Sequence, residues 1–390
     1  MIIAGRLTQL RNYPMKEISQ SSPVCSYNEW DPLEEVIVGS IEGVSIPALT
    51  HEMKAFIRKE YWDFYQKNAG KPYPSEMVQK AATALDNLQH VLENEGITVR
   101  RPGPIDFGSM VAKTPYFAAS GFCNADVRDV LLVVGDQIIE APMSQRCRYF
   151  EYLRYRPLIM EYWKKGAKWT AAPKSGMPDA LYDWDYPEDD MSWFRGESGV
   201  PATVGPLVGR FITTEAEPCF DAADFTRFGR DILAQRSQVT NELGIQWVER
   251  HLAPEYRIHR VKFHDPGPVH MDATWVPIGE GKVLSCPDRP CLSPDILDMF
   301  KRGGWEIFYP PRGVAKAEFH MSSSWLSMNI LMLDSQRVIV EASEQPTIDF
   351  FRSIGIQPIP VDFKDHYVFG GGIHCATSDI RRKGPLKSYF

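Results

Sequence analysis

DVLLVVGDQIIEA, residues 129–141, consists of two runs of β-forming residues joined by a polar Gly-Asp turn. A tight polar turn between two such runs is typical of a β-hairpin. Two later stretches have the same pattern, ATWVPIGEGKVLSC at 273–286 and MNILMLDSQRVIVEA at 328–342. Less regular examples are LEEVIVGS at 33–40 and the stretch 224–236. The sequence therefore predicts a hairpin that recurs five times along the chain.

A helix and a short strand follow each predicted hairpin. In the stretch that follows the hairpin expected at 33–40, helical spacing relates Met77, Ala81, Leu85, Leu88 and Leu92. A glycine then closes each helix, as is common at helix C-termini, and these glycines are Gly96, Gly166, Gly244, Gly303 and Gly355. The short strands that follow are expected at 97–102, 168–173, 258–263, 305–311 and 356–363. The repeating unit is therefore ββαβ.

Five such units in one chain favour a closed ring, because radial repetition leaves few exposed sheet edges. The expected fold class is α/β, a five-bladed pseudo-symmetric α/β propeller built from ββαβ units. A doubly wound parallel sheet is the competing architecture, but it would not place a hairpin in every unit. We expect one domain over 26–390 after a loosely ordered extension at 1–25. The stretch 174–210, rich in Pro, Gly, Asp and Trp, is expected to be a long insertion, and such loops are often functional lids.

The composition is that of an ordinary globular protein, with 44% hydrophobic and 24% charged residues among 390. The net charge is −7 and no block of Lys and Arg occurs, which argues against a nucleic-acid partner. No apolar run approaches the roughly 20 residues that span a bilayer, and the start lacks the apolar core of a secretory signal. We therefore expect a cytoplasmic protein with no membrane partner. The seven cysteines are expected to be reduced thiols, and Cys286 and Cys291 lack the partners of a zinc site.

The stretch FGGGIHCATSDIRR, residues 369–382, places three glycines just before Cys375. These glycines do not match G-x-G-x-x-G, and no Lys-Ser or Lys-Thr follows them, so a phosphate-binding loop is a weak interpretation. A second interpretation is that the glycines let the backbone bend closely around a reacting group held by Cys375. That interpretation needs partners elsewhere in the chain.

Polar residues open the other predicted hairpins, where the inner strands of a ring would bring them together. They are Asp129, then Asp221 and Asp224, then His270 and Asp272, then Ser322, Ser323 and Ser324. Each type also has a common structural role, because cysteine is often a small core residue and aspartate often caps a helix. Their recurrence at the same place in separate units favours a shared site. His374 and the other cysteines gain no role from this pattern.

A cysteine, a histidine and a carboxylate suit covalent catalysis, in which the thiolate attacks, the imidazole moves protons and the acid orients the imidazole. Two further carboxylates, Asp129 and Asp272, suggest a substrate with a planar cation such as guanidinium. An adjacent guanidinium would also lower the pKa of the thiol. Arg289, in CPDRP, is equally consistent with a substrate-carboxylate ligand and with a solvated surface arginine.

At these residues the chain resembles the amidinotransferase family over about residues 25–390. The matching stretches are NEWDPLEEVIVG, RDVLLVVGDQIIEAPM, GAKWTAAPK, EPCFDAADFTRFGRDILAQRSQVTNELGI, MDATW, SCPDRPC, SSSWLSMNILMLD and GGIHCATSDIRRKG. The resemblance implies the propeller of the guanidine-modifying superfamily, which agrees with the repeats. It implies that Cys375 is the nucleophile, His270 the general acid and base, and Asp221 the partner of His270.

The resemblance also implies the binding residues and the reaction. Asp129 and Asp272 would hold the guanidinium, Arg289 the carboxylate of arginine, and Ser322 with Ser323 other polar atoms of the amino acid. A ping-pong reaction would then move the amidino group of arginine to an acceptor amine and release ornithine. The resemblance implies no metal and no cofactor, and small-molecule partners alone, with a homodimer left open. Asp224 would lie behind the residues that touch substrate.

One segment departs from family members of the creatine pathway, which have Asn and Met where this chain has Gly267 and Val269 in DPGPVH. The smaller side chains put glycine in doubt as acceptor, and lysine or an amine of a natural-product intermediate are the alternatives. Two other functions remain open from sequence. One is a guanidine hydrolase of the arginine-deiminase type, although the segment is FDAAD and not the EGGD of deiminases. The other is a ring-shaped binding protein without catalysis.

Overall fold

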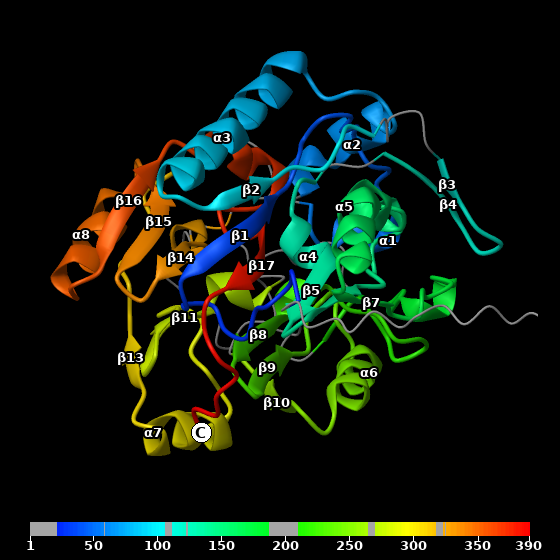
Figure 1. Cartoon of the computed structure of the whole chain (residues 1–390). Coiled ribbons are helices and arrows are strands. Elements are labelled where there is room, and N and C mark those ends of the chain that lie inside the picture. The colour runs from blue at the N-terminus through cyan, green and yellow to red at the C-terminus, as the bar shows by residue number, and fades with distance from the viewer. Residues whose placement is uncertain are drawn as a thin grey trace, which may run out of the picture.

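The computed structural model describes residues 22–57, 59–105, 111–121, 124–186, 210–263, 270–316, 323 and 325–390. Fifteen strands build its main sheets (Figure 1). Their bounds are β1 (Leu33–Val38), β2 (Thr98–Arg100), β5 (Leu131–Val134), β6 (Gln137–Glu140), β7 (Lys168–Ala171), β8 (Phe225–Phe228), β9 (Asp231–Gln235), β10 (Arg257–Val261), β11 (Trp275–Gly279), β12 (Lys282–Ser285), β13 (Glu306–Phe308), β14 (Leu331–Asp334), β15 (Arg337–Glu341), β16 (Gln357–Val361) and β17 (Thr377–Arg382).

These strands form five three-stranded sheets with one shared pattern of strand pairing. The sheets are β17-β1-β2, β5-β6-β7, β8-β9-β10, β11-β12-β13 and β14-β15-β16. In each sheet the middle strand pairs antiparallel with one neighbour and parallel with the other. The parallel neighbour follows a helix, because a parallel pair needs a crossover connection. The ββαβ unit predicted from the sequence is confirmed in the four sheets that begin with β5, β8, β11 and β14.

A helix leads directly into the parallel strand of each sheet. These helices are α3 (Ser75–Asn94), α5 (Tyr152–Lys164), α6 (Glu242–Leu252), α7 (Pro294–Arg302) and α8 (Gln345–Ser353). The apolar stripe predicted on α3 is buried at Ala81, Leu85, Leu88 and Leu92. Glycines with positive φ follow four of the helices, namely Gly96, Gly166, Gly304 and Gly355. Gly303 is the C-cap of α7, as expected, and the glycine with positive φ is the next residue, Gly304.

Gly244 does not end a helix, contrary to expectation. It lies in the first turn of α6, where its backbone N–H donates to the side chain of Asn241, the N-cap, at 2.8 Å. A Cβ at this position would lie 2.2 Å from the backbone oxygen of Cys219. The glycine is required by close backbone approach, and α6 ends at Leu252, before Ala253.

The first sheet differs from the other four and from the prediction for 33–40. That stretch contains the single strand β1, and its antiparallel partner is β17, with Leu33 opposite Arg382 and Val38 opposite Thr377. Figure 1 shows the blue strand β1 beside the red strand β17. No second β-forming run follows residue 38 across a tight turn, so the chain takes its hairpin partner from its other end. β17 therefore occupies the place that β5, β8, β11 and β14 occupy in their sheets.

The remaining elements lie before β5. They are α1 (His51–Lys54), α2 (Trp62–Asn68), β3 (Val111–Lys113), β4 (Ala118–Ser120) and α4 (Val127–Val130). The β3–β4 hairpin extends away from the rest of the fold in Figure 1. Within the described part of the chain, no helix is long and apolar enough to cross a membrane.

Two segments predicted to lie outside regular structure have described portions. Val24 is fully buried and the backbone N–H of Cys25 donates to Ile380, so packed structure begins before residue 26. In the expected insertion at 174–210, residues 179–181 form a 3₁₀ turn and Tyr182 bridges Thr213. Residues 187–209 of that insertion lie outside the described residues.

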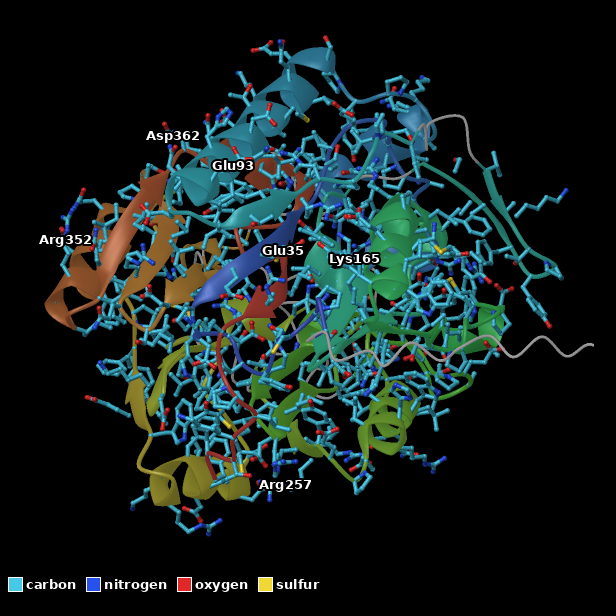
Figure 2. All side chains as sticks on the ribbon, in the orientation of Figure 1. Glu35, Glu93, Lys165, Arg257, Arg352 and Asp362 are labelled. Carbon is cyan, nitrogen blue, oxygen red and sulfur yellow. The ribbon has the colours of Figure 1, made fainter. Side chains whose placement is uncertain are left out.

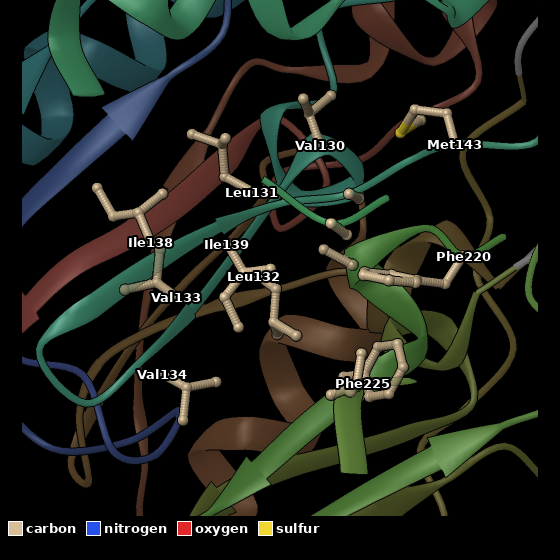
Figure 3. Packing of buried hydrophobic residues seen from close by; sticks show 14 of the residues in the cluster. Val130, Leu131, Leu132, Val133, Val134, Ile138, Ile139, Met143, Phe220 and Phe225 are labelled. Atoms are coloured by element: carbon tan, nitrogen blue, oxygen red, sulfur yellow. The ribbon is translucent and has the colours of Figure 1, made fainter. Parts of the chain in front are cut away.

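The apolar core lies between the sheets and their helices. Figure 3 shows the hairpin β5–β6, where Val133 and Ile139 pack in the same cluster as Phe220 and Phe225. All four residues of β5 are buried, because other elements cover both faces of the strand. Complete burial of one such side chain contributes about 1.5–3 kcal/mol. This packing holds the first strands of the sheets in place, and the polar residues of the site lie just before those strands.

Charged side chains divide between the periphery and the interior. Figure 2 shows Arg352 and Asp362 toward the outer edge of the molecule, whereas Glu35 lies on β1 near the middle. Glu35 is 7% exposed and accepts a hydrogen bond of 2.7 Å from the hydroxyl of Tyr162 on α5. A buried charge is retained where such partners replace water.

Candidate active site

A short turn precedes the first strand of each sheet and carries the polar residues singled out in the sequence. The turns are α4 before β5, residues 222–224 before β8, residues 271–273 before β11 and residues 326–328 before β14, while the glycine-rich loop precedes β17. The turn 222–224 contacts α4 and the turn 271–273, which in turn contacts 326–328, and α4 contacts β17. The expectation that the hairpin openings meet is confirmed for these segments.

Cys375 lies at the centre of this arrangement and is 6% exposed. Its Sγ is 3.3 Å from Oδ2 of Asp272, to which the thiol can donate. Asn329 contacts the same cysteine twice, since Nδ2 donates to Sγ at 3.1 Å and Oδ1 accepts from the backbone N–H at 3.1 Å. The nucleophile predicted from the sequence is therefore buried, hydrogen-bonded and next to a carboxylate.

The glycines before Cys375 allow close packing against the side chains of the site. A Cβ on Gly371 would lie 2.0 Å from Oδ1 of Asp126, and one on Gly372 would lie 2.5 Å from Oδ1 of Asn329. His366 also donates from Nδ1 to the backbone oxygen of Gly371 at 3.0 Å. Any side chain at these two glycines would displace the residues around the thiol.

His270 lies between two carboxylates. Its Nε2 is 3.1 Å from Oδ2 of Asp221, and its Nδ1 is 3.4 Å from Oδ1 of Asp129. Burial alone would lower the pKa of His270, but the charge of Asp129 and the hydrogen bond with Asp221 outweigh it and raise the pKa to about 10. His270 is therefore an imidazolium near neutral pH, ready to donate a proton.

A buried arginine, which the sequence did not reveal as a site residue, supports both carboxylates. Nη1 of Arg148 donates to Oδ2 of Asp129 at 2.7 Å and lies 3.6 Å from Oδ2 of Asp221. Arg148 also bonds Glu151, three residues later. Burial and the charge of Asp221 raise the pKa of Asp129, although His270 and Arg148 oppose the shift. Ligand atoms of Asp129, Asp221 and His270 lie within 4.8 Å of one another, as a metal site would require, but Arg148 already supplies a positive charge there.

Asp272 is held by His374, which precedes Cys375 in the chain. No role was predicted for His374 from the sequence. Nδ1 of His374 donates to Oδ2 of Asp272 at 2.8 Å, and its Nε2 lies 3.5 Å from Oε2 of Glu29. Burial would raise the pKa of Asp272, but the hydrogen bond and the charge of His374 outweigh it and lower the pKa. Asp272 is thus a carboxylate, and His374 is a part of the site that the sequence analysis missed.

The surroundings of Cys375 disfavour its thiolate while no substrate is bound. Burial, followed by the charges of Asp272, Asp126 and Asp129, raises the pKa of the Cys375 thiol well above its ordinary value. Asp126 is a further acid that the sequence analysis did not consider, and it is 3% exposed. A cation bound among these carboxylates would reverse the effect.

Behind these residues is a cavity of about 20 Å³, lined by Asp272 and His374 together with Glu29 and Arg128. That volume holds about one water molecule. Arg227 joins Glu29 at 2.8 Å and Asp379 at 2.9 Å, so a buried ion-pair network continues from the cavity. It connects the site to β17.

The structure describes three of the other predicted site residues, namely Arg289, Ser323 and Asp224. Arg289, 7% exposed, lies in the loop after β12. Asp288 in that loop accepts a 3.0 Å hydrogen bond from the indole Nε1 of Trp325. The backbone N–H of Trp325 donates to Oγ of Ser323 at 3.2 Å. Asp224 accepts from Gln235 and Ser237, so it braces its turn from behind. Ser322, Gly267 and Val269 lie outside the described residues.

Comparison with known proteins gives the family. No family model matches the chain. It is 50% identical over 374 residues to the mitochondrial glycine amidinotransferase of Danio rerio, covering 95% of this chain and 86% of that protein. It is 44% identical over 381 residues to the L-arginine:L-lysine amidinotransferase of Pseudomonas savastanoi pv. phaseolicola, covering 96% and 100%.

Solved structures agree with these relatives. SxtG, an amidinotransferase from Microseira wollei in the saxitoxin biosynthetic pathway, has a TM-score of 0.83 and 45% identity, covering 94% of this chain and 100% of that one. A dimethylarginine dimethylaminohydrolase, at 12% identity and a TM-score of 0.52 over 88% of this chain and 98% of that one, shares the α/β fold alone. The long, nearly complete matches above 40% identity are to transferases, and the chain therefore belongs to the amidinotransferase family.

Proposed function

We propose that the protein moves the amidino group of L-arginine to an acceptor amine through a covalent intermediate on Cys375 and releases L-ornithine. The observation that carries the proposal is the buried thiol of Cys375, 3.3 Å from Asp272, beside a series of contacting turns that also presents the pair His270–Asp221. A thiol, an imidazolium and guanidinium-binding carboxylates are the groups that this transfer needs.

The first half-reaction begins when the guanidinium binds between Asp129 and Asp272. Its positive charge offsets the carboxylates that raise the pKa of Cys375, and the thiol proton leaves to water. The thiolate attacks the guanidinium carbon to form a C–S bond. His270, as imidazolium, protonates the leaving nitrogen as the C–N bond breaks. Ornithine departs with its side-chain amine neutral. The amidino group remains bonded to the sulfur of Cys375 and carries the positive charge.

The second half-reaction restores both groups. A neutral acceptor amine attacks the carbon of the adduct, and the now neutral His270 removes the proton of that amine. The C–S bond breaks, the sulfur leaves as thiolate, and the new guanidinium carries the positive charge. The hydrogen bond from His270 to Asp221 keeps the imidazole aimed through both steps.

Arginine use should fall in Asp129→Asn, because the change removes one charge from the guanidinium site and preserves the shape of the side chain. A lost hydrogen bond to a charged group corresponds to about a 10- to 100-fold decrease in kcat/KM for arginine. The measurement is steady-state kinetics beside thermal unfolding.

Asp231→Asn is the matched control, because Asp231 is 1% exposed and pairs with Arg257 at 2.7 Å outside the site. It should lower stability and leave kcat/KM unchanged. Wild-type arginine kinetics in folded Asp129→Asn would restrict Asp129 to a structural role.

The acceptor is proposed from the segment before His270. Relatives are named for glycine and for lysine, and Gly267 with Val269 leaves more room than Asn with Met. We favour lysine or an amine of a natural-product intermediate over glycine. The cytoplasmic location stays a prediction, since several relatives are named as mitochondrial. A homodimer also stays a prediction.

The double substitution Gly267→Asn with Val269→Met should slow transfer to the native amine and leave the burst of ornithine intact. The reason is that the first half-reaction involves only the donor. Burst amplitudes are measured beside steady-state rates with glycine, lysine and larger amines. Identical acceptor preferences in the wild type and the double variant would show that these positions do not select the acceptor. Glycine would then be the preferred candidate acceptor.

The rival function is hydrolysis of arginine to citrulline, which would use the same thiol and histidine. The decisive test incubates the protein with arginine and assorted amines and analyses the products by mass. Ornithine together with a new guanidine supports transfer, citrulline supports the hydrolase, and unchanged arginine supports a binding protein.

We also infer that the five sheets form the blades of a closed five-bladed propeller. The support is the shared pattern of strand pairing in the sheets, the series of contacts among their turns, and the pairing of β17 with β1. The single domain over 26–390 is part of this proposal.

A further inference from the structure

The side-chain amide of Asn329 has one orientation that fits its surroundings. The backbone N–H of Cys375 must face an acceptor, so Oδ1 of Asn329 lies at that position, 3.1 Å away. The amide nitrogen then faces Sγ at 3.1 Å and the backbone oxygen of Asp272 at 3.4 Å. If the amide were flipped, its NH₂ group would face the backbone N–H of Cys375, donor against donor. Its oxygen would face the backbone oxygen of Asp272, acceptor against acceptor.

Several contacts hold this amide in place. Asn329 is 1% exposed and connects the turn 326–328 to β14. Its backbone oxygen accepts from the N–H of His374 at 3.3 Å, so both residues of the pair 374–375 are bonded to it. The backbone of Gly372 packs closely against the amide, since a Cβ at that position would lie 2.5 Å from Oδ1 of Asn329. The donor aimed at the sulfur is therefore fixed before the reaction begins.

The charged side chains that act most strongly on the sulfur are negative. Asp272, Asp126 and Asp129 all disfavour a negative charge on Cys375. Among the side chains that the structure describes, Asn329 is the one whose nitrogen donates to Sγ. A hydrogen bond to the charged form of a group favours that form.

We propose that Asn329 is a catalytic residue whose amide N–H stabilises the thiolate of Cys375. The role extends the proposed transfer reaction and rests on it. The sulfur carries negative charge twice, as the attacking thiolate and again as the leaving group when the acceptor displaces it. In the first step the carboxylates are paired with the guanidinium. The fixed amide can donate a hydrogen bond to the sulfur in both steps, when the thiolate attacks and when it leaves. Both half-reactions therefore depend on Asn329.

Asn329→Asp tests the idea with almost no change of shape. One carboxylate oxygen can still accept from the backbone of Cys375, while the other replaces the donor with an acceptor facing Sγ. We expect the pH at which iodoacetamide alkylates Cys375 to rise by about one unit or more, and both half-reactions to slow about 10- to 100-fold. Alkylation is followed by peptide mass at Cys375, and the half-reactions by ornithine burst and by transfer from the trapped adduct.

Asn241→Asp is the matched control, because Asn241 is equally buried but its amide caps α6 and does not contact the sulfur. Its alkylation profile should equal that of the wild type. Asn329→Ser provides a second variant without added charge, should the aspartate variant not fold. A wild-type alkylation profile and burst rate in either folded Asn329 variant overturns the proposal. Failure of the proposed function is seen separately, as wild-type protein that forms no ornithine.

Discussion

Cys375→Ser is expected to fold like the wild type and to form no detectable ornithine from arginine. A hydroxyl at neutral pH is a far poorer nucleophile than a thiolate, and loss of a nucleophile from a covalent mechanism lowers kcat on the order of 10⁴-fold or more. The hydrogen bond that the backbone N–H of residue 375 donates to Oδ1 of Asn329 does not depend on sulfur, so the loop should keep its position. Circular dichroism and thermal unfolding verify the fold, and amino-acid analysis measures ornithine.

Cys25→Ser is the control, since Cys25 is partly exposed and lies outside the site. It should retain wild-type turnover. Peptide mapping of the wild type after a single addition of arginine should find the amidino adduct on Cys375. An adduct on Cys147 or Cys219, or wild-type turnover in Cys375→Ser, would refute the covalent mechanism.

His270→Gln has the second-largest expected effect, a decrease of about 10²- to 10⁴-fold in turnover. Glutamine can still hydrogen-bond but cannot donate a proton to the leaving nitrogen or remove one from the acceptor. Rapid quenching should show a slow ornithine burst and a slow transfer step. His259→Gln is the matched control, because His259 also bonds a carboxylate, Asp231, at 2.7 Å. Equal loss in both variants would point to general destabilisation.

The pH dependence separates the acid role of His270 from a structural one. The first half-reaction needs protonated His270, so its rate should fall only as pH approaches the raised pKa of about 10. Asp221→Asn removes the hydrogen-bonded charge and should lower the pKa of His270. The alkaline limb of the burst rate should then move to lower pH. An unmoved limb would assign it to another group.

Local sequence signals predicted the hairpins, helices and short strands of four sheets. Gly135, Gly229 and Gly281 adopt positive φ in the turns, and each turn lies between the two strands that it joins. The partner of β1 carries no such signal, because TSDIRR pairs with a strand at the opposite end of the chain and includes a buried ionic residue, Asp379. Gly244 was the poorest case among the predicted helix ends, since helical residues continue beyond it in the sequence, but its close backbone packing against Cys219 gives no local sequence signal.

In the site, residue type and repeated position predicted candidate reacting groups but not the side chains that hold them. Cys375, His270 and Asp221 could be proposed because covalent catalysis uses those residue types. Asn329 and Arg148 resemble ordinary polar residues, and their roles arise from contacts with residues far away in the sequence. The spacing of Asn329 just before an apolar strand, equivalent to the other hairpin openings, was the signal that could have identified it.

The pairing of β1 with β17 has a consequence for synthesis of the chain. Val38 emerges from the ribosome early, but its partner Thr377 is made near the end of the described sequence. Four sheets draw all their strands from single continuous segments, and such units can fold as they emerge. The sheet containing β1 must instead wait for long-range closure, which is slow. Because Cys375 lies next to β17, the nucleophile reaches its carboxylates only when this last sheet is completed, and a nascent chain does not present the assembled site.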